Sequence, residues 1–106
     1  MTKYYIGFDC GTQSTKTAIY REDTQCVAQC QIPTTISYPA PGLAEMDVDE
    51  YLRSVREGIR SCLDQSGIDP SEVRAICGDG IICGVVGVDA DGEAITPYIP
   101  YLDNRG

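Results

Sequence analysis

Alternating apolar and polar positions near the start of the chain predict three β-strands. Residues 4–8 form a short apolar run, and residues 25–32 form another run with strand-like composition. Between them, in residues 14–20, one set of side chains alternates with another: Thr15, Thr17 and Ile19 against Lys16, Ala18 and Tyr20. The polar stretches 9–12 and 21–24 separate these runs and have the composition of turns. Because both connections are short, we expect the three strands to form an antiparallel meander.

The periodicity becomes helical after a proline- and glycine-containing loop at residues 34–45. Asp47 is a predicted N-cap, Glu50 is spaced to complete a capping box, and Ser66 and Gly67 are predicted to end the helix. Between these ends, one apolar stripe is expected at Val48, Tyr51, Leu52, Val55, Ile59, Cys62 and Leu63. The stripe predicts an amphipathic helix that packs against the meander.

The remainder of the chain is expected to extend the sheet. Residues 69–72 indicate a turn or a single helical turn, and 73–78 form an apolar run typical of a strand buried inside a sheet. Another apolar run at 81–88 leads to a hairpin signal at 89–92, from which residues 93–97 would return. Together these elements predict a mixed α/β sheet with a flanking helix, in one domain over the 106 residues.

The charge and the cysteines narrow the functional classes. Eight basic and sixteen acidic residues give a net charge of −8, which disfavours a nucleic acid partner. No signal segment or membrane-length apolar run is present, so a cytosolic protein without membrane contact is expected. In that compartment the six cysteines predict reduced and mostly buried thiols. With no histidine in the chain, a structural metal site is not expected.

The polar turn between the first two strands carries the clearest chemistry. Gly11 permits a tight turn with outward N–H groups, and the hydroxyls that follow it add donors, a combination that can hold phosphate oxygens. Asp9, at the tip of the first strand, could hold Mg²⁺ directly or through water. The same residues are typical of a polar hairpin with no ligand, and spacing alone favours that interpretation because short glycine turns are common.

The sequence resembles the FGGY carbohydrate kinases in four segments that follow one another in the same order. The first is Tyr5-Ile6-Gly7-Phe8-Asp9-Cys10-Gly11-Thr12-Gln13-Ser14-Thr15-Lys16. The others are Tyr38-Pro39 with Gly42-Leu43-Ala44-Glu45-Met46-Asp47, then Val88-Asp89-Ala90-Asp91-Gly92-Glu93, and finally Tyr101-Leu102-Asp103-Asn104-Arg105, which is similar to the family's Trp-x-Asp-x-Arg segment. Agreement in four places covers nearly the whole chain.

The resemblance implies a ribonuclease H-like fold of the actin and hexokinase superfamily, in which ATP and Mg²⁺ are the cofactors. It implies that Asp9 serves the metal and that the phosphates of ATP meet Asp9, Gly11, Thr12, Gln13, Ser14, Thr15 and Lys16. By this resemblance the chain is the N-terminal portion of the first domain, incomplete by itself. The catalytic base is then expected beyond Gly106, with no catalytic residue within the chain.

A sugar site is also implied by the resemblance. Gly80-Ile81-Ile82-Cys83-Gly84 occupies the place of Gly-Gln-Met-His-Gly in xylulokinase members, so two polar side chains are replaced. The substrate-binding residues implied are Asp79, Ile82, Cys83, Asp103 and Arg105. Asp79 could equally be a strand-end residue beside a glycine turn. Asp103 and Arg105 could equally form a surface ion pair.

The function expected from the resemblance is transfer of the γ-phosphate of ATP to a hydroxyl of a sugar or polyol, with xylulose the leading substrate. The chain alone is expected to be inactive. Two alternatives remain: a non-kinase ATPase of the actin and heat-shock superfamily, and a non-catalytic interaction domain. A homodimer is a further expectation, because an incomplete domain exposes sheet edges.

Overall fold

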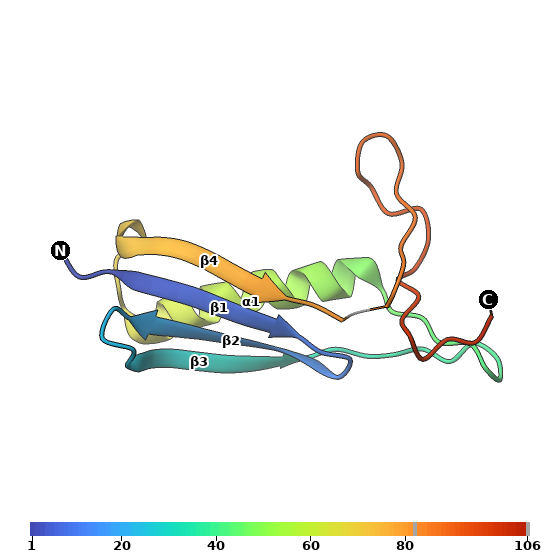
Figure 1. Cartoon of the computed structure of the whole chain (residues 1–106), viewed down its shortest axis with the longest axis horizontal. Helices are drawn as coiled ribbons and strands as arrows, with labels where there is room; N and C mark the ends of the chain where they lie inside the picture. The colour runs from blue at the N-terminus through green and yellow to red at the C-terminus, as the bar shows by residue number, and fades with distance from the viewer. Residues whose placement is uncertain (82, 106) are drawn as a thin grey trace.

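A four-stranded mixed sheet with one helix on a single face forms the body of the molecule (Figure 1). The computed structural model describes residues 1–81 and 83–105. Its elements are β1 (Tyr4–Cys10), β2 (Ser14–Arg21), β3 (Cys26–Pro33), α1 (Val48–Ser66), the 3₁₀ turn η1 (Pro70–Glu72) and β4 (Val73–Asp79). The sheet order is β3-β2-β1-β4, with β1, β2 and β3 antiparallel and β4 parallel to β1. The predicted meander and flanking helix are confirmed.

Both ends of α1 lie where the local sequence signals placed them. The Asp47 carboxylate accepts a hydrogen bond from the Asp49 N–H at 2.9 Å, as an N-cap does. Gly67 adopts a left-handed conformation, φ 67°, and its N–H donates to the Leu63 carbonyl. Two short-range interactions therefore fix the length of the helix.

Glu50 does not complete the predicted capping box. Its carboxylate accepts hydrogen bonds from the Thr35 N–H, at 2.6 Å, and from the Thr35 hydroxyl. Thr35 lies in the loop that precedes the helix, so the contact ties this loop to the first helical turn. The prediction was wrong because a donor distant in sequence displaced the local partner.

Small side chains bring α1 close to the sheet. The buried helix residues are Ser54, Gly58 and Cys62, each one turn from the next, and a Cβ at Gly58 would collide with the Thr17 hydroxyl of β2. Cys62 packs in a core with Ile6, Ile19 and Ala28 from three strands. Leu52, which the predicted apolar stripe includes, is 49% exposed.

The strand β4 differs from its prediction because it lies at the sheet edge. The parallel pairing with β1 is its only strand pairing among the described residues. Val73 is half-buried and every residue after it in the strand is exposed, including Ile76 at 54%. An apolar run of this kind is typical of an interior strand. In the part of the chain that the structure describes, β4 is instead an exposed edge strand, so the prediction that it is buried inside the sheet is wrong.

The segment that follows β4 is mostly irregular. The strands predicted at 81–88 and 93–97 are replaced, in the described part, by single bridges that join Val88 to Ala94 and Val85 to Ile99. The predicted turn at 89–92 is present, and the Asp89 carboxylate accepts from the backbone N–H groups of Asp91 and Glu93. In Figure 1 this segment extends past the carboxyl ends of β1 and β4, and the two termini lie at opposite ends of the molecule.

Two chain-wide findings complete the description. None of the described helices has the length and apolar character needed to cross a membrane. The cysteines are free thiols as expected, but only Cys10 and Cys62 are buried, so the prediction of mostly buried thiols is wrong.

Candidate functional site

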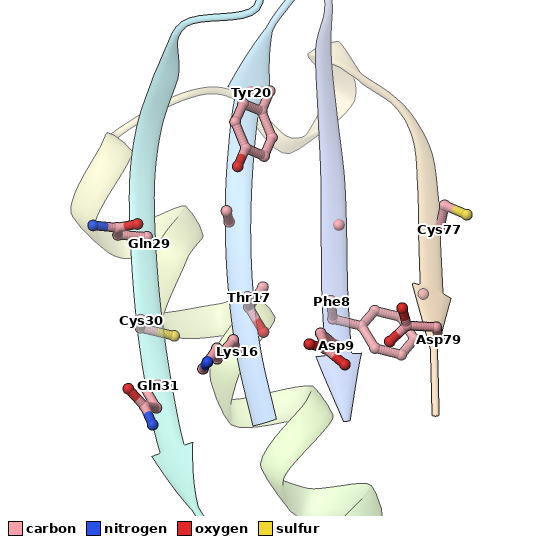
Figure 2. A pocket seen from close by; sticks show the side chains of 13 residues that line it. Phe8, Asp9, Lys16, Thr17, Tyr20, Gln29, Cys30, Gln31, Cys77 and Asp79 are labelled. Atoms are coloured by element: carbon pink, nitrogen blue, oxygen red, sulfur yellow. The ribbon is translucent and has the colours of Figure 1, made fainter. Parts of the chain in front are cut away.

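Two carboxylates meet at the carboxyl ends of neighbouring strands. Asp9 is an exposed residue one position before the end of β1, and its register partner on β4 is Asp79 (Figure 2). A hydrogen bond with the Asp9 carboxyl raises the pKa of Asp79 above its ordinary value, and partial desolvation and the like charge act in the same direction. Parallel pairing of β1 and β4 is what brings these residues together, across a sequence separation that local patterns do not reveal.

A cation and several amides share the same face of the sheet. Lys16 on β2 is the register partner of Asp9 on β1. Both line a pocket of about 830 Å³, to which Gln29, Gln31 and Asp79 also contribute. In Figure 2 the helix lies behind the strands, so the pocket covers the face turned away from α1. The pocket is therefore polar at the end of the sheet where the two carboxylates lie.

The residues Gln29, Gln31, Phe8 and Cys77 of this pocket were not among the predicted site residues. The period-2 pattern of β3 could have placed both glutamines on one face, because side chains alternate along a strand. Phe8 offered no such signal. Its ring occupies the space that a side chain at Gly78 would need, which depends on the pairing of β1 with β4.

The turn between β1 and β2 presents free backbone donors. The Gly11 N–H donates to the Ser14 carbonyl at 2.9 Å, and the Gln13 carbonyl accepts from the Thr34 N–H at 2.9 Å. The amides of Thr12 and Gln13 have no acceptor among the described residues. A Cβ at Gly11 would lie 3.2 Å from the Ser14 oxygen, so a small residue suits the closed turn. Adjacent unpaired N–H groups are what an anion-binding loop requires.

One predicted phosphate ligand points elsewhere. Thr15 is fully buried, and its hydroxyl lies 2.7 Å from the Ser54 hydroxyl of α1. Because Ser54 donates its proton to the Tyr51 carbonyl, Thr15 is the donor in this pair. The expectation that the Thr15 hydroxyl faces the phosphates is therefore corrected. Ser14 stays at the turn, where its hydroxyl accepts from the Gln31 amide at 2.9 Å.

The loop after β4 is held by a tyrosine from residues 98–105, which we call the C-terminal segment. The Tyr98 hydroxyl donates to the Ile81 carbonyl at 3.0 Å, and its ring centroid lies 6.0 Å from that of Tyr51. Burial raises the pKa of Tyr98, which keeps the hydroxyl protonated as a donor. Cys83 has a positive φ of 59° in this loop. Ile82, predicted to contact the sugar, lies outside the described residues.

The predicted pair Asp103 and Arg105 forms an ion-pair network. Arg105 donates to both Asp103 oxygens at 2.7 Å and to Glu45 at 3.0 Å, while Asp103 also accepts from the Ala44 N–H at 2.7 Å. The Arg105 guanidinium holds the pKa of the Asp103 carboxyl well below its usual range. The network fastens the C-terminal segment to residues 44 and 45.

A second hollow joins this network to the loop after β4. Its volume is about 500 Å³, and its lining includes Cys83, Gly84, Tyr101, Asp103 and Arg105. The predicted substrate residues thus divide into two places: Asp79 lies beside Asp9 in the first pocket, and the other described members line the second.

Comparison with known proteins gives a consistent family. Residues 4–106 match the family model described as "FGGY family of carbohydrate kinases, N-terminal domain". The chain is 33% identical over 104 residues to the probable L-xylulose kinase of Haemophilus influenzae, covering 96% of this chain and 21% of that protein. It is 36% identical over 75 residues to the glycerol kinase of Nitratidesulfovibrio vulgaris, covering 71% and 15% respectively.

A solved structure shows the same arrangement of elements. The xylulose kinase from Rhodospirillum rubrum superposes with a TM-score of 0.86 at 32% sequence identity, over 97% of this chain and 21% of that one. The fold is thus that of the sugar kinases of the actin and hexokinase superfamily, as the resemblance implied. The chain spans about a fifth or less of the length of these relatives. With a family model matched from residue 4 to residue 106, the chain belongs to the FGGY family of carbohydrate kinases.

Proposed function

We propose that this chain supplies the phosphate-binding turn and part of the sugar-binding surface of a kinase that transfers the γ-phosphate of ATP to a sugar or polyol hydroxyl. The observation that carries the proposal is the Asp9 carboxylate near the end of β1, with the unpaired amides of Thr12 and Gln13 in the turn that follows. Phosphoryl transfer depends mainly on positioning and on neutralising charge, and this arrangement can do both.

The donor set fits magnesium. Mg²⁺ in nucleotide sites is held by one or two carboxylates, with phosphate oxygens and water completing the octahedron. Asp9 and Asp79 offer hard oxygen ligands at adjacent strand ends, and Asp9 is the proposed metal residue. When bound, the ion would neutralise negative charge on the β- and γ-phosphates. Within the described residues, no group of three or more potential metal-ligating side chains gathers, and phosphate oxygens and water would supply the other ligands.

The chain's own residues would position the nucleotide. The Thr12 and Gln13 N–H groups would donate to phosphate oxygens, and the Ser14 hydroxyl stands beside them. Lys16, the register partner of Asp9, would add positive charge near the same phosphates. Thr15 would not contact the nucleotide; its hydrogen bond to Ser54 joins β2 to α1 on the opposite face of the sheet.

The hollow of about 500 Å³ is the proposed surface for the acceptor. Cys83 and Tyr101 would contact the sugar, and Arg105 and Asp103 would shape the wall through their ion pair. Xylulose is the leading substrate, supported by the similarity to the xylulose kinases of Haemophilus influenzae and Rhodospirillum rubrum. Glycerol is the second candidate, supported by the glycerol kinase match.

The activity of the chain by itself is part of the proposal. Because it spans only 15–21% of the relatives, we propose that it forms a portion of the first kinase domain and that the catalytic base lies in a region it does not cover. The free thiols fit a cytoplasmic protein. We therefore expect the isolated chain to phosphorylate no sugar.

The test compares the isolated chain with a full-length kinase that begins with these residues. ATP consumption is measured against D-xylulose, L-xylulose, glycerol and no acceptor. We expect acceptor-dependent turnover by the full-length kinase and none by the chain. Equal ATP hydrolysis with and without every acceptor would instead support a non-kinase ATPase. A full-length protein with no nucleotide binding would support an interaction domain, and either result would reject the proposal.

A further inference from the structure

Two thiols on different elements face each other between the sheet and the helix α1. Cys30 lies on β3 and Cys62 on α1, and their Sγ atoms are 3.6 Å apart although 32 residues separate them in sequence. Cys62 is fully buried, whereas Cys30 is half-buried. Neither thiol has a part in the proposed phosphate or sugar chemistry.

The packing of the helix explains why the two sulfurs are so close. Gly58 lies one turn before Cys62, and it lets α1 approach β2 and β3 more closely than a larger residue would. The Cys30 sulfur donates to the Gly58 carbonyl at 3.3 Å, and the Cys62 sulfur donates to the Thr17 carbonyl at 3.4 Å. Each thiol is therefore held from a second side, which keeps the pair together.

We propose that Cys30 and Cys62 form a reversible disulfide when the protein meets a low-molecular-weight disulfide such as oxidised glutathione. An S–S bond is about 2.05 Å long, so the two sulfurs must approach by roughly 1.5 Å. Rotation about the side-chain torsions of two residues on adjoining elements is the motion that is needed. The modification cross-links α1 to β3.

The exchange proceeds in two balanced steps. The half-buried Cys30 thiol loses its proton, and its thiolate attacks one sulfur of the oxidant, which forms a mixed disulfide and releases one glutathione thiolate. The Cys62 thiol then loses its proton, and its sulfur attacks the Cys30 sulfur and expels the second glutathione. The two cysteines are oxidised, and one disulfide molecule is reduced to two thiols.

Burial determines the order and the speed of these steps. Burial raises the pKa of the Cys62 thiol to about 12, and the contact with Cys30 acts in the same direction. Attack from outside therefore begins at the accessible Cys30. Closure of the bond is slow at neutral pH and accelerates as the pH rises, because more Cys62 thiolate becomes available.

The test uses the purified chain, reduced and then treated with oxidised glutathione while it remains folded. Free thiols are alkylated, and intact mass and tryptic peptides are measured. We expect a mass loss of two hydrogens and a cross-link between the peptides 22–53 and 61–74, with fragmentation locating it at Cys30 and Cys62. The thermal midpoint should rise by on the order of 10 °C and return on reduction.

Variants separate this pair from its neighbours. Cys30→Ser and Cys62→Ser should each abolish the cross-link, while Cys26→Ser, at an exposed position on the same strand, should retain it. If a variant does not fold, locating the cross-link by peptide fragmentation in the original chain still tests the proposal. A bond through Cys26, Cys77 or Cys83, a mixed disulfide that persists at Cys30, or no oxidation at all in the folded chain would overturn the proposal.

Discussion

The Tyr98 hydroxyl occupies the space that a side chain at Gly84 would need, and from there it donates a hydrogen bond to the Ile81 carbonyl. The contact joins the loop after β4 to the C-terminal segment. Because Gly84 lines the proposed sugar hollow, the close approach of Tyr98 leaves no room for a larger residue at this point of the wall.

Gly84→Ala should displace Tyr98 and break its hydrogen bond to Ile81. We expect a loss of about 1–3 kcal/mol in the free energy of unfolding, from overpacking together with the lost hydrogen bond. Tyr98→Phe removes only the hydroxyl and should cost about 1 kcal/mol. Urea unfolding monitored by circular dichroism measures both. Equal stability of Gly84→Ala and the original chain would show that this contact does not constrain the loop.

Gly58→Ala should destabilise the chain although alanine favours helices. A methyl group there would collide with the Thr17 hydroxyl, and we expect a net loss of about 1–3 kcal/mol. The Thr17 hydroxyl is buried with no partner among the described residues, so Thr17→Ala in the Gly58→Ala background should recover part of the loss. Urea midpoints of the single and double variants test this. Strict additivity would contradict a direct contact.

Acid should weaken the link between the C-terminal segment and residues 44 and 45. The Arg105 guanidinium lowers the pKa of Asp103 in the folded chain, so the stabilisation is complete above the unfolded value of about 4. It is lost as the pH falls through the lower folded value. Asp103→Asn should therefore reduce stability at pH 7 and flatten the acid limb of the stability profile.

The matched control for that prediction is Asp64→Asn, at an exposed position on α1. Urea midpoints are measured from acid to neutral pH for the original chain and both variants. Asp64→Asn should follow the original profile. If Asp103→Asn also follows it, the ion pair contributes nothing measurable to stability, and its proposed role in fastening the C-terminal segment is wrong.

Local signals were sufficient for the meander and for the helix ends. Asp47 and Gly67 act through hydrogen bonds within their own turn, which is why the sequence alone located them. Glu50 was misplaced because its partner, Thr35, belongs to a preceding loop. The position of β4 at the edge was missed because an apolar run does not reveal how many neighbours a strand has.

The candidate site was foreseen in part, and the family resemblance gave most of it. The turn after Asp9 was identified from its residues, but the pairing of Asp9 with Asp79 depends on parallel strands joined through the helix. The inward direction of Thr15 depends on Ser54, which approaches only because α1 packs closely. Contacts between distant segments of this kind carry no signature in a single sequence.

The central claim is that Asp9 handles the magnesium of a nucleotide held by the neighbouring turn. The most direct measurement is calorimetric titration of ATP into a full-length kinase that begins with these residues, with Mg²⁺ and with a chelator, for the original protein, Asp9→Asn and the control Asp64→Asn. We predict that Mg²⁺ tightens ATP binding on the order of tenfold or more in the original and the control, and that Asp9→Asn loses this gain. An unchanged gain in Asp9→Asn would contradict the account.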